Sequence, residues 1–266
     1  RPLSVILSMF SRDEEETQKN REDIALGFKG AMFEQRTKHL LQVCSQIDAK
    51  RLHIKITKEK DLEREIDLAF VLDKTLFLFE CKSFNQPYTV REHAKTNKKI
   101  KEAIKQLNKN ADYFEENISI TLKQLGLSEE ISIEKVQRVL LTSTILGEAG
   151  KQENVLVVDE ASFNAFLLRN PPTVSHIDGA IKERICLDTE NIYSGKITAE
   201  KLLVFLRRQL SVKIMQSFIV KTHDSDRKVE YKYCKKDIED SYIENDGKIK
   251  IALGRVFATY EKNLSE

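Results

Sequence analysis

The stretch EREIDLAFVLDKTLFLFECKSF, residues 63–84, decides the fold of this chain. It holds two β-rich runs, residues 65–72 and 75–83, which are separated only by Asp73 and Lys74. This spacing predicts an antiparallel hairpin with a tight turn. Both runs are apolar on both faces over part of their length, as strands are when helices cover each side of a sheet. The hairpin therefore predicts a layered α/β core.

The segment before the hairpin predicts a helix and one strand. An S-x-x-E capping box at residues 11–14 begins a helical apolar pattern that runs to about residue 47, with Gly27 and Gly30 as points where it could divide. Residues 52–58 then alternate between apolar and polar side chains, which predicts a half-buried strand at or near a sheet edge.

The segment after the hairpin adds a long helix and two more strands. Residues 90–116 predict a basic amphipathic helix. Apolar runs at 136–145 and 155–159 predict strands around a turn at 147–150, and Ser162 is expected to cap a short helix through residue 168. The predicted order is α, β, β, β, α, β, β, α.

Two consecutive prolines, Pro171 and Pro172, end that helix and begin a polar loop to about residue 179. We place a boundary here, between a first domain of residues 11–170 and a C-terminal accessory region of residues 171–266. This region is expected to be an α+β extension with short strands between 213 and 260. Thr198 is expected to cap its one clear helix, with these residues facing inward: Leu202, Leu203, Phe205, Leu206 and Leu210.

Composition excludes several classes of protein. The 266 residues are 41% hydrophobic and 32% charged, which excludes a disordered or fibrous chain. Lys plus Arg number 44 against 42 for Asp plus Glu, so any basic surface must be local. Four scattered cysteines, Cys44, Cys81, Cys186 and Cys234, fit neither a zinc site nor a disulfide framework and favour a reducing compartment.

The chain lacks an apolar run near the roughly 20 residues of a membrane span. We therefore expect a cytoplasmic protein with no membrane partner. The sequence starts at Arg1 rather than Met, which indicates a fragment or a processed form. An upstream domain or a partner could accordingly belong to the complete protein.

Charged residues end the apolar pattern of the hairpin. On the second strand, Glu80 and Lys82 continue an otherwise apolar face, and Cys81 points to the other face. Alternation also groups four residues on one face of the first strand, Glu65, Asp67, Ala69 and Val71. Asp67 can thus sit across the hairpin from Glu80.

Burying these charges costs several kcal/mol per ion unless each meets an opposite charge or a metal. Mg²⁺ is usually held by one or two carboxylates, and its other positions are left to water and substrate phosphate. The pattern favours Mg²⁺ on Asp67 and Glu80, with Mn²⁺ as a substitute and the Cys81 carbonyl as a further ligand. Lys82 would orient the attacking water, which makes a phosphodiester hydrolysis site. A satisfied ion-pair cluster at a strand end is the structural alternative.

These residues resemble the D…(D/E)-x-K signature of the PD-(D/E)XK nuclease superfamily. They look most similar to its nuclease-related and Mrr-like or resolvase-like branches, in which a helical Glu precedes an E-I-D strand and an E-x-K strand. Here the matching residues are Glu34, Glu65-Ile66-Asp67 and Glu80-Cys81-Lys82. The resemblance covers roughly residues 20–168 and implies a restriction-endonuclease-like αβββαβ core, with a central mixed sheet flanked by helices.

The resemblance also implies site residues. Asp67 and Glu80 would bind Mg²⁺, Lys82 would assist the nucleophilic water, and Glu34 would contact the metal or its water shell. Gln106 would correspond to a glutamine on the helix after the E-x-K strand. Asn110 departs from the usual Q-x-x-x-Y pattern because it takes the place of the tyrosine.

Lysines follow one side of that same helix, at Lys98, Lys101, Lys105 and Lys109. Their position next to the predicted site favours contact with DNA phosphates, and a merely solvated face is the alternative. Together the observations predict a metal-dependent endonuclease acting on duplex DNA, and a homodimer is a further expectation. A catalytically silent nucleic-acid-binding or assembly module, and a nuclease for RNA or branched junctions, remain alternatives. Sequence specificity and biological role stay open.

Overall fold

The computed structural model describes residues 22–56, 62–87, 89–144, 150–152, 154–178, 181–186, 188, 190–209, 220–223 and 229–232. The chain divides into two compact units. The first contains Arg1–Leu146 and Lys151–Ala161, and the second contains Gly147–Gly150 and Ser162–Glu266. The capping box predicted at residues 11–14 lies outside the described residues.

The first unit contains a mixed six-stranded sheet. Its elements in chain order are α2 (Glu22–Ser45), β1 (Lys50–Ile56), β2 (Leu62–Leu72), β3 (Thr75–Lys82), α3 (Val90–Glu116), α4 (Ile118–Leu125), β4 (Lys135–Thr142), β5 (Gly150–Gln152) and β6 (Val155–Asp159). The strand order is β1-β2-β3-β4-β6-β5. β1, β2 and β3 are antiparallel neighbours, and β3, β4 and β6 run parallel. The predicted α/β class with a mixed sheet is confirmed.

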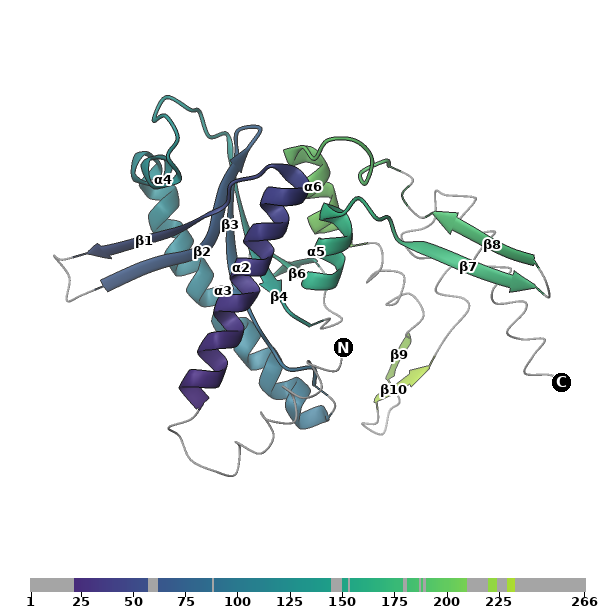
Figure 1. Cartoon of the computed structure of the whole chain (residues 1–266). Helices are drawn as coiled ribbons and strands as arrows, with labels where there is room; N and C mark the ends of the chain where they lie inside the picture. The colour runs from purple at the N-terminus through teal and green to yellow at the C-terminus, as the bar shows by residue number, and fades with distance from the viewer. Residues whose placement is uncertain are drawn as a thin grey trace. The chain divides into compact units, whose positions relative to one another are not determined.

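Helices cover both faces of this sheet, with α2 in front and α3 behind (Figure 1). Buried residues of α3, including Ile104 and Leu107, form one core cluster with Leu76 and Leu78 of β3. On the other face, Phe70 stacks on Phe77 and Phe79 with ring centroids 5.1 and 5.6 Å apart. The hairpin strands are apolar on both faces because both faces are covered.

The hairpin turn confirms the prediction at Asp73 and Lys74. Their φ angles are 44° and 63°, and two successive left-handed residues are typical of the two-residue turns that match strand twist. The turn sets the register from Leu72 opposite Thr75 to Leu68 opposite Phe79. Asp67 lies just beyond the last pair, beside the end of β3 that holds Glu80.

A bulge interrupts β2 at the predicted site. The β1–β2 register shifts between Lys50↔Ala69 and Leu52↔Ile66, so one residue of β1 faces two residues of β2. Ile66 and Ala69 consequently both join the core cluster beside α3, although they are three residues apart. The expectation that Glu65, Asp67, Ala69 and Val71 share one face is therefore wrong, because the bulge reverses the alternation.

Several predicted boundaries also change. Helix α2 continues through Gly27 and Gly30 without a break, and a Cβ built on Gly30 would meet nothing within 4 Å. Helix α4 was not predicted; it packs against α3 and is ended by the left-handed Gly126. Gly150, expected in a turn, begins the short strand β5.

The second unit takes in α5 (Glu160–Leu167) from Ser162 onward, a hairpin of β7 (Thr173–Asp178) and β8 (Ile181–Cys186), α6 (Ala199–Arg207), and a second hairpin of β9 (Val220–His223) and β10 (Val229–Lys232). Aromatic side chains form its core, where the rings of Phe166 and Phe205 stack with centroids 4.4 Å apart. Figure 1 labels these elements, which agree with the predicted α+β character.

Two expectations for this part of the chain are wrong and two are confirmed. Residues 173–178 form strand β7 rather than a polar loop, because their β-branched residues find a partner in β8. Ser162 lies inside α5, which begins at Glu160. Thr198 does cap α6, since its hydroxyl accepts from the Lys201 amide at 3.3 Å. Leu202, Leu203, Phe205 and Leu206 are buried as predicted, and Leu210 lies outside the described residues.

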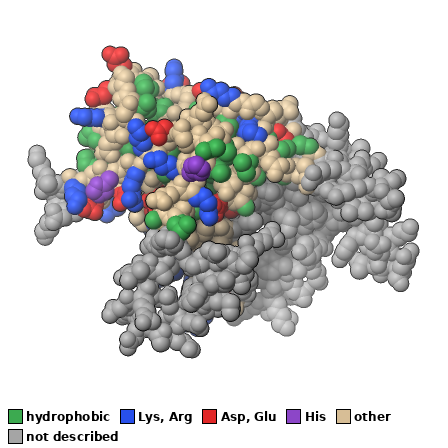
Figure 2. Space-filling model, in the orientation of Figure 1, with side chains coloured by type: hydrophobic (Ala, Val, Ile, Leu, Met, Phe, Trp, Pro, Cys, Tyr) green, Lys and Arg blue, Asp and Glu red, His purple; other side chains and the backbone are tan. Residues whose placement is uncertain are grey.

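The surface reflects the balanced composition. On the face seen in Figure 2, basic side chains are interspersed with acidic and hydrophobic ones. None of the helices in the described part of the chain combines the length and the hydrophobicity of a membrane span. The described cysteines, Cys44, Cys81 and Cys186, are free thiols.

Candidate active site

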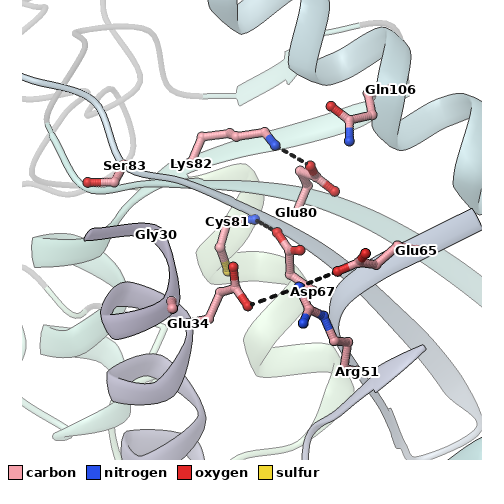
Figure 3. A pocket seen from close by; sticks show the side chains of 11 residues that line it. Gly30, Glu34, Arg51, Glu65, Asp67, Glu80, Cys81, Lys82, Ser83 and Gln106 are labelled. Atoms are coloured by element: carbon pink, nitrogen blue, oxygen red, sulfur yellow. Dashed lines mark hydrogen bonds and ion pairs between the residues drawn. The ribbon is translucent and has the colours of Figure 1, made fainter. Parts of the chain in front are cut away.

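A pocket of about 480 Å³ lies where the β2 bulge and the end of β3 meet α2 and α3 (Figure 3). Its charged lining consists of Glu34, Glu65, Asp67 and Glu80 together with Arg51 and Lys82. Gly30, Ala31, Cys81, Ser83 and Gln106 complete it. The structure therefore brings together all the predicted site residues except the lysines of α3.

Asp67 is fixed by the backbone of β3. The Cys81 amide donates to Asp67 Oδ2 at 2.7 Å, just beyond the last hairpin pair, Leu68↔Phe79. The carboxylate thus accepts from an amide at the point where main-chain pairing ends. Burial raises the pKa of Asp67, while the hydrogen bond from Cys81 and the charge of Lys82 act in the opposite direction.

Glu80 and Lys82 form a close pair at the end of β3. Lys82 Nζ lies 2.6 Å from Glu80 Oε1, and Glu80 is only 2% exposed. Burial, and then repulsion from Asp67, raise the pKa of Glu80 to about 7. Burial disfavours the charged form of Lys82, but attraction to Glu80, its hydrogen bond and the charge of Asp67 outweigh this and raise the pKa of Lys82. Lys82 is therefore a cation at neutral pH.

Cys81 lines the pocket, but its side chain is buried. Its side chain is 4% exposed, as expected for a residue on the opposite face of β3 from Glu80 and Lys82. Burial, and then the negative charge of Asp67, raise the pKa of the thiol well above its usual value. A thiol held neutral in this way is a poor nucleophile. A metal ligand from this residue would have to be its carbonyl.

Glu34 reaches the pocket from α2, as the resemblance implies. Burial and then the charge of Asp67 raise the pKa of Glu34, and Arg51 opposes the shift. Arg51 Nη2 lies 3.8 Å from Glu34 Oε2 and also pairs with Glu65. Arg51 is absent from the predicted site because its place opposite Asp67 depends on the pairing register of β1 with β2, for which the sequence carries no local signal.

Helix α3 contributes two amide side chains at this end of the sheet. Gln106 lines the pocket, as predicted. Asn110, one turn later, is 7% exposed and donates from Nδ2 to the Glu65 carbonyl at 2.7 Å. The residue that departs from the family pattern therefore ties α3 to β2 next to the bulge.

The chain just after Lys82 is held by β4. The Ser143 amide donates to the Lys82 carbonyl at 3.1 Å. The Ser143 hydroxyl accepts from the Phe84 amide at 2.9 Å and donates to the Phe84 carbonyl at 3.0 Å. These hydrogen bonds from Ser143, which the sequence did not suggest, limit the movement of the backbone that carries Lys82.

The four lysines of α3 are exposed. Lys98, Lys101, Lys105 and Lys109 face solvent, and Lys98 lies 4.0 Å from Glu102 in an i,i+4 pair. Gln106 is the α3 residue that lines the pocket. A role for these lysines in nucleic-acid binding stays a prediction.

The pocket chemistry fits a hard divalent cation. Four carboxylates face two cationic side chains, so the fully ionised pocket carries a net charge of −2. Within the described residues, no group of three or more His, Cys, Asp or Glu side chains is arranged to hold a metal alone. Mg²⁺ does not need such a group, because one or two carboxylates with water and substrate oxygens are its usual ligands.

Comparison with known proteins defines the class of this domain. Residues 29–142 match the family model of the nuclease-related domain, which belongs to the restriction-endonuclease-like or PD-(D/E)XK nuclease superfamily. The match runs from α2 to the end of β4 and includes every residue that lines the pocket. The resemblance predicted from sequence is confirmed. No curated protein and no solved structure matches the chain.

The raised carboxyl pKa values predict that the metal-free protein loses stability as pH rises. Between the ordinary pKa of 4.5 and the folded value of about 7, the folded state keeps a proton on Glu80 that the unfolded state releases. The free energy of unfolding in EDTA should fall from pH 5 to pH 8, by up to about 3 kcal/mol from this group. Urea unfolding at several pH values tests it. A free energy of unfolding that stays level or rises over this interval would contradict the raised pKa.

Proposed function

We propose that this domain is a divalent-metal-dependent endonuclease that hydrolyses phosphodiester bonds of duplex DNA. One observation carries the proposal: Asp67, Glu80 and Lys82 meet in a single open pocket inside the nuclease-related domain. The hydrogen bond to Asp67 and the ion pair to Lys82 hold these groups in defined positions.

Asp67 and Glu80 would hold Mg²⁺, or Mn²⁺ in its place. When bound, the ion would polarise a phosphoryl oxygen and lower the pKa of a bound water. Glu34 faces the same space from α2 and would contact the metal or its water shell. The Cys81 carbonyl is the further oxygen ligand that we propose.

Lys82 would act on the attacking water and on the charge that develops at phosphorus. Its ammonium carries three donors, and its bond to Glu80 Oε1 uses one of them. The water oxygen gives up a proton to solvent and forms a bond to phosphorus while a backbone P–O bond breaks, and the leaving oxygen takes up a proton from solvent. A fixed cation beside this phosphate stabilises the added negative charge.

DNA binding would extend beyond the pocket. The exposed lysines at 98, 101, 105 and 109 supply charges for phosphate contacts along α3. Residues 171–266 would then serve substrate binding, dimerisation or regulation. A homodimer, or a partner protein, belongs to the same proposal.

The test is cleavage by the purified chain. Supercoiled, linear and single-stranded DNA and a single-stranded RNA are each incubated with Mg²⁺, Mn²⁺ or EDTA. We expect nicking of supercoiled DNA with either metal and none in EDTA. Cleavage of RNA alone would overturn the substrate class. Salt-sensitive DNA binding without cleavage in any metal would identify a silent binding module instead.

A further inference from the structure

Arg51 occupies a distinct position in the pocket. It belongs to the edge strand β1 and faces the bulge formed by Asp67 and Leu68 of β2. Two cationic side chains line the pocket, and Figure 3 shows Arg51 and Lys82 on opposite sides of Asp67. Lys82 lies on the β3 side, next to Glu80. Arg51 is thus the cation on the β1 side.

The contacts of Arg51 use one end of its guanidinium. Its ion pairs to Glu34 and Glu65 both involve Nη2. The side chain is 58% exposed, so water reaches the remaining donors. A guanidinium carries five N–H donors in a planar fork, which leaves most of them for another acceptor.

The ion pairs of the exposed Arg51 side chain add little to the stability of the fold. Exposed ion pairs usually contribute little to stability. The planar fork of arginine instead matches the oxygens of a phosphate, which it binds with two parallel hydrogen bonds. Placed on the wall of a pocket that holds the D…E-x-K residues, Arg51 is suited to a substrate phosphate.

Charge balance supports the same role. Four carboxylates and two cations give the pocket a net charge of −2, which repels a phosphodiester. A divalent ion on Asp67 and Glu80 would bring this net charge to zero. Its positive charge would, however, be located at these two carboxylates. A phosphate that reaches this ion would have Lys82 on one side and Arg51 on the other.

We propose that Arg51 is a substrate-binding residue, whose Nε and Nη1 donate to non-bridging oxygens of the phosphate on the side opposite Lys82. This inference rests on the proposed nuclease function. The competing explanation is structural: Arg51 would only hold Glu34 and Glu65 in place. The two explanations predict different effects for removing the cation and for removing its partner.

The experiment measures binding of a fluorescein-labelled 30-base-pair DNA duplex by anisotropy, with Ca²⁺ in place of Mg²⁺ and a gel to show that the duplex stays intact. Wild type is compared with Arg51→Gln, Arg51→Lys and Glu65→Gln over a range of salt concentrations. Arg36→Gln is the matched control, because its side chain is also 58% exposed and also pairs with a carboxylate, Glu160, but does not line the pocket.

We expect Arg51→Gln to weaken binding about tenfold and to reduce the slope of log K against log salt by about one, the change for one lost phosphate contact. Arg51→Lys should restore the slope but only part of the affinity. Glu65→Gln should bind as tightly as wild type or more tightly, because it removes a negative charge and keeps the cation. Arg36→Gln should match wild type.

Two results would overturn the inference while leaving the nuclease proposal intact. The first is wild-type affinity and slope in Arg51→Gln, in a protein that cleaves DNA. The second is an equal loss of binding in Arg51→Gln and Glu65→Gln, which is the signature of a purely structural pair. A wild type that neither binds nor cleaves any nucleic acid would overturn the nuclease proposal and this inference together.

Discussion

Replacing Lys82 by Gln, or Asp67 by Asn, should lower the rate of phosphodiester cleavage by about 10³-fold and leave the domain folded. Each change removes a charge but keeps a hydrogen-bonding group. The Asn oxygen can still accept from the Cys81 amide, and the Gln amide can still donate to Glu80. Alanine at position 67 would leave that buried amide without its acceptor, at a cost of about 1–3 kcal/mol.

Matched variants separate loss of chemistry from loss of structure. Asp73→Asn changes the hairpin turn, where an asparagine tolerates the left-handed backbone, and Lys123→Gln changes an exposed residue of α4. Both should cleave supercoiled DNA at the wild-type rate. Circular dichroism should show the same fold for all four variants. Cleavage by Lys82→Gln or Asp67→Asn at the wild-type rate would show that the reaction occurs elsewhere.

Replacing Glu80 by Gln should change stability and activity in opposite directions. At pH 8 the wild-type carboxylate is largely ionised, although burial and Asp67 favour its neutral form. Glutamine is a neutral group of the same shape. We therefore expect the metal-free variant to be more stable than wild type by about 2 kcal/mol at pH 8. Cleavage should fall by about 10³-fold, because one of the two proposed metal ligands is lost.

The comparison uses urea unfolding with EDTA and with saturating Mg²⁺. Added Mg²⁺ should raise the free energy of unfolding of wild type and leave Glu80→Gln unchanged, because a ligand stabilises only the state that binds it. Glu134→Gln, at an exposed position, is the control for the substitution itself. A Glu80→Gln protein that is less stable than wild type in EDTA would show that the ionised pair with Lys82 stabilises the fold.

Local patterns explain why so much of the first unit could be predicted. Helix α3 spans Val90–Glu116, and strand β6 spans Val155–Asp159, as the periodicity indicated. The Thr89 capping box fixes the start of α3, since the Thr89 hydroxyl accepts from the Glu92 amide and Glu92 accepts from the Thr89 amide. Such signals lie within a few residues of one another and need no tertiary contact.

Elements without a strong local signal were missed. Strand β7 follows two prolines and contains polar residues, so its sequence predicts a loop. In the structure, β8 supplies the hydrogen bonds that make it a strand. The α3 lysines show the same limit for function. The sequence pattern of an exposed charged helix face is the same whether the face binds phosphate or is only solvated. Their role therefore stays a prediction.

The D…E-x-K signature itself was determined by the sequence alone. The order of its charged residues along the two strands, and the two-residue turn between these strands, place Asp67 beside the end of β3 that carries Glu80 and Lys82. Both of these are local properties of the chain. Residues 29–142 match the nuclease-related family for the same reason, because the motif and its strands lie in one short segment.

Only the tertiary structure decided what surrounds that signature. The register of β1 with β2 brings Arg51 to Asp67, and Asn110 ties α3 to Glu65 across 45 positions of the chain. Ser143 likewise holds Phe84 across 59 positions. These contacts depend on how strands register and how helices cross the sheet, and such packing arises from the sum of many weak interactions. Sequence alone therefore determined which residues form the D…E-x-K signature. Packing decided which other residues lie close enough to shift the pKa values of these residues.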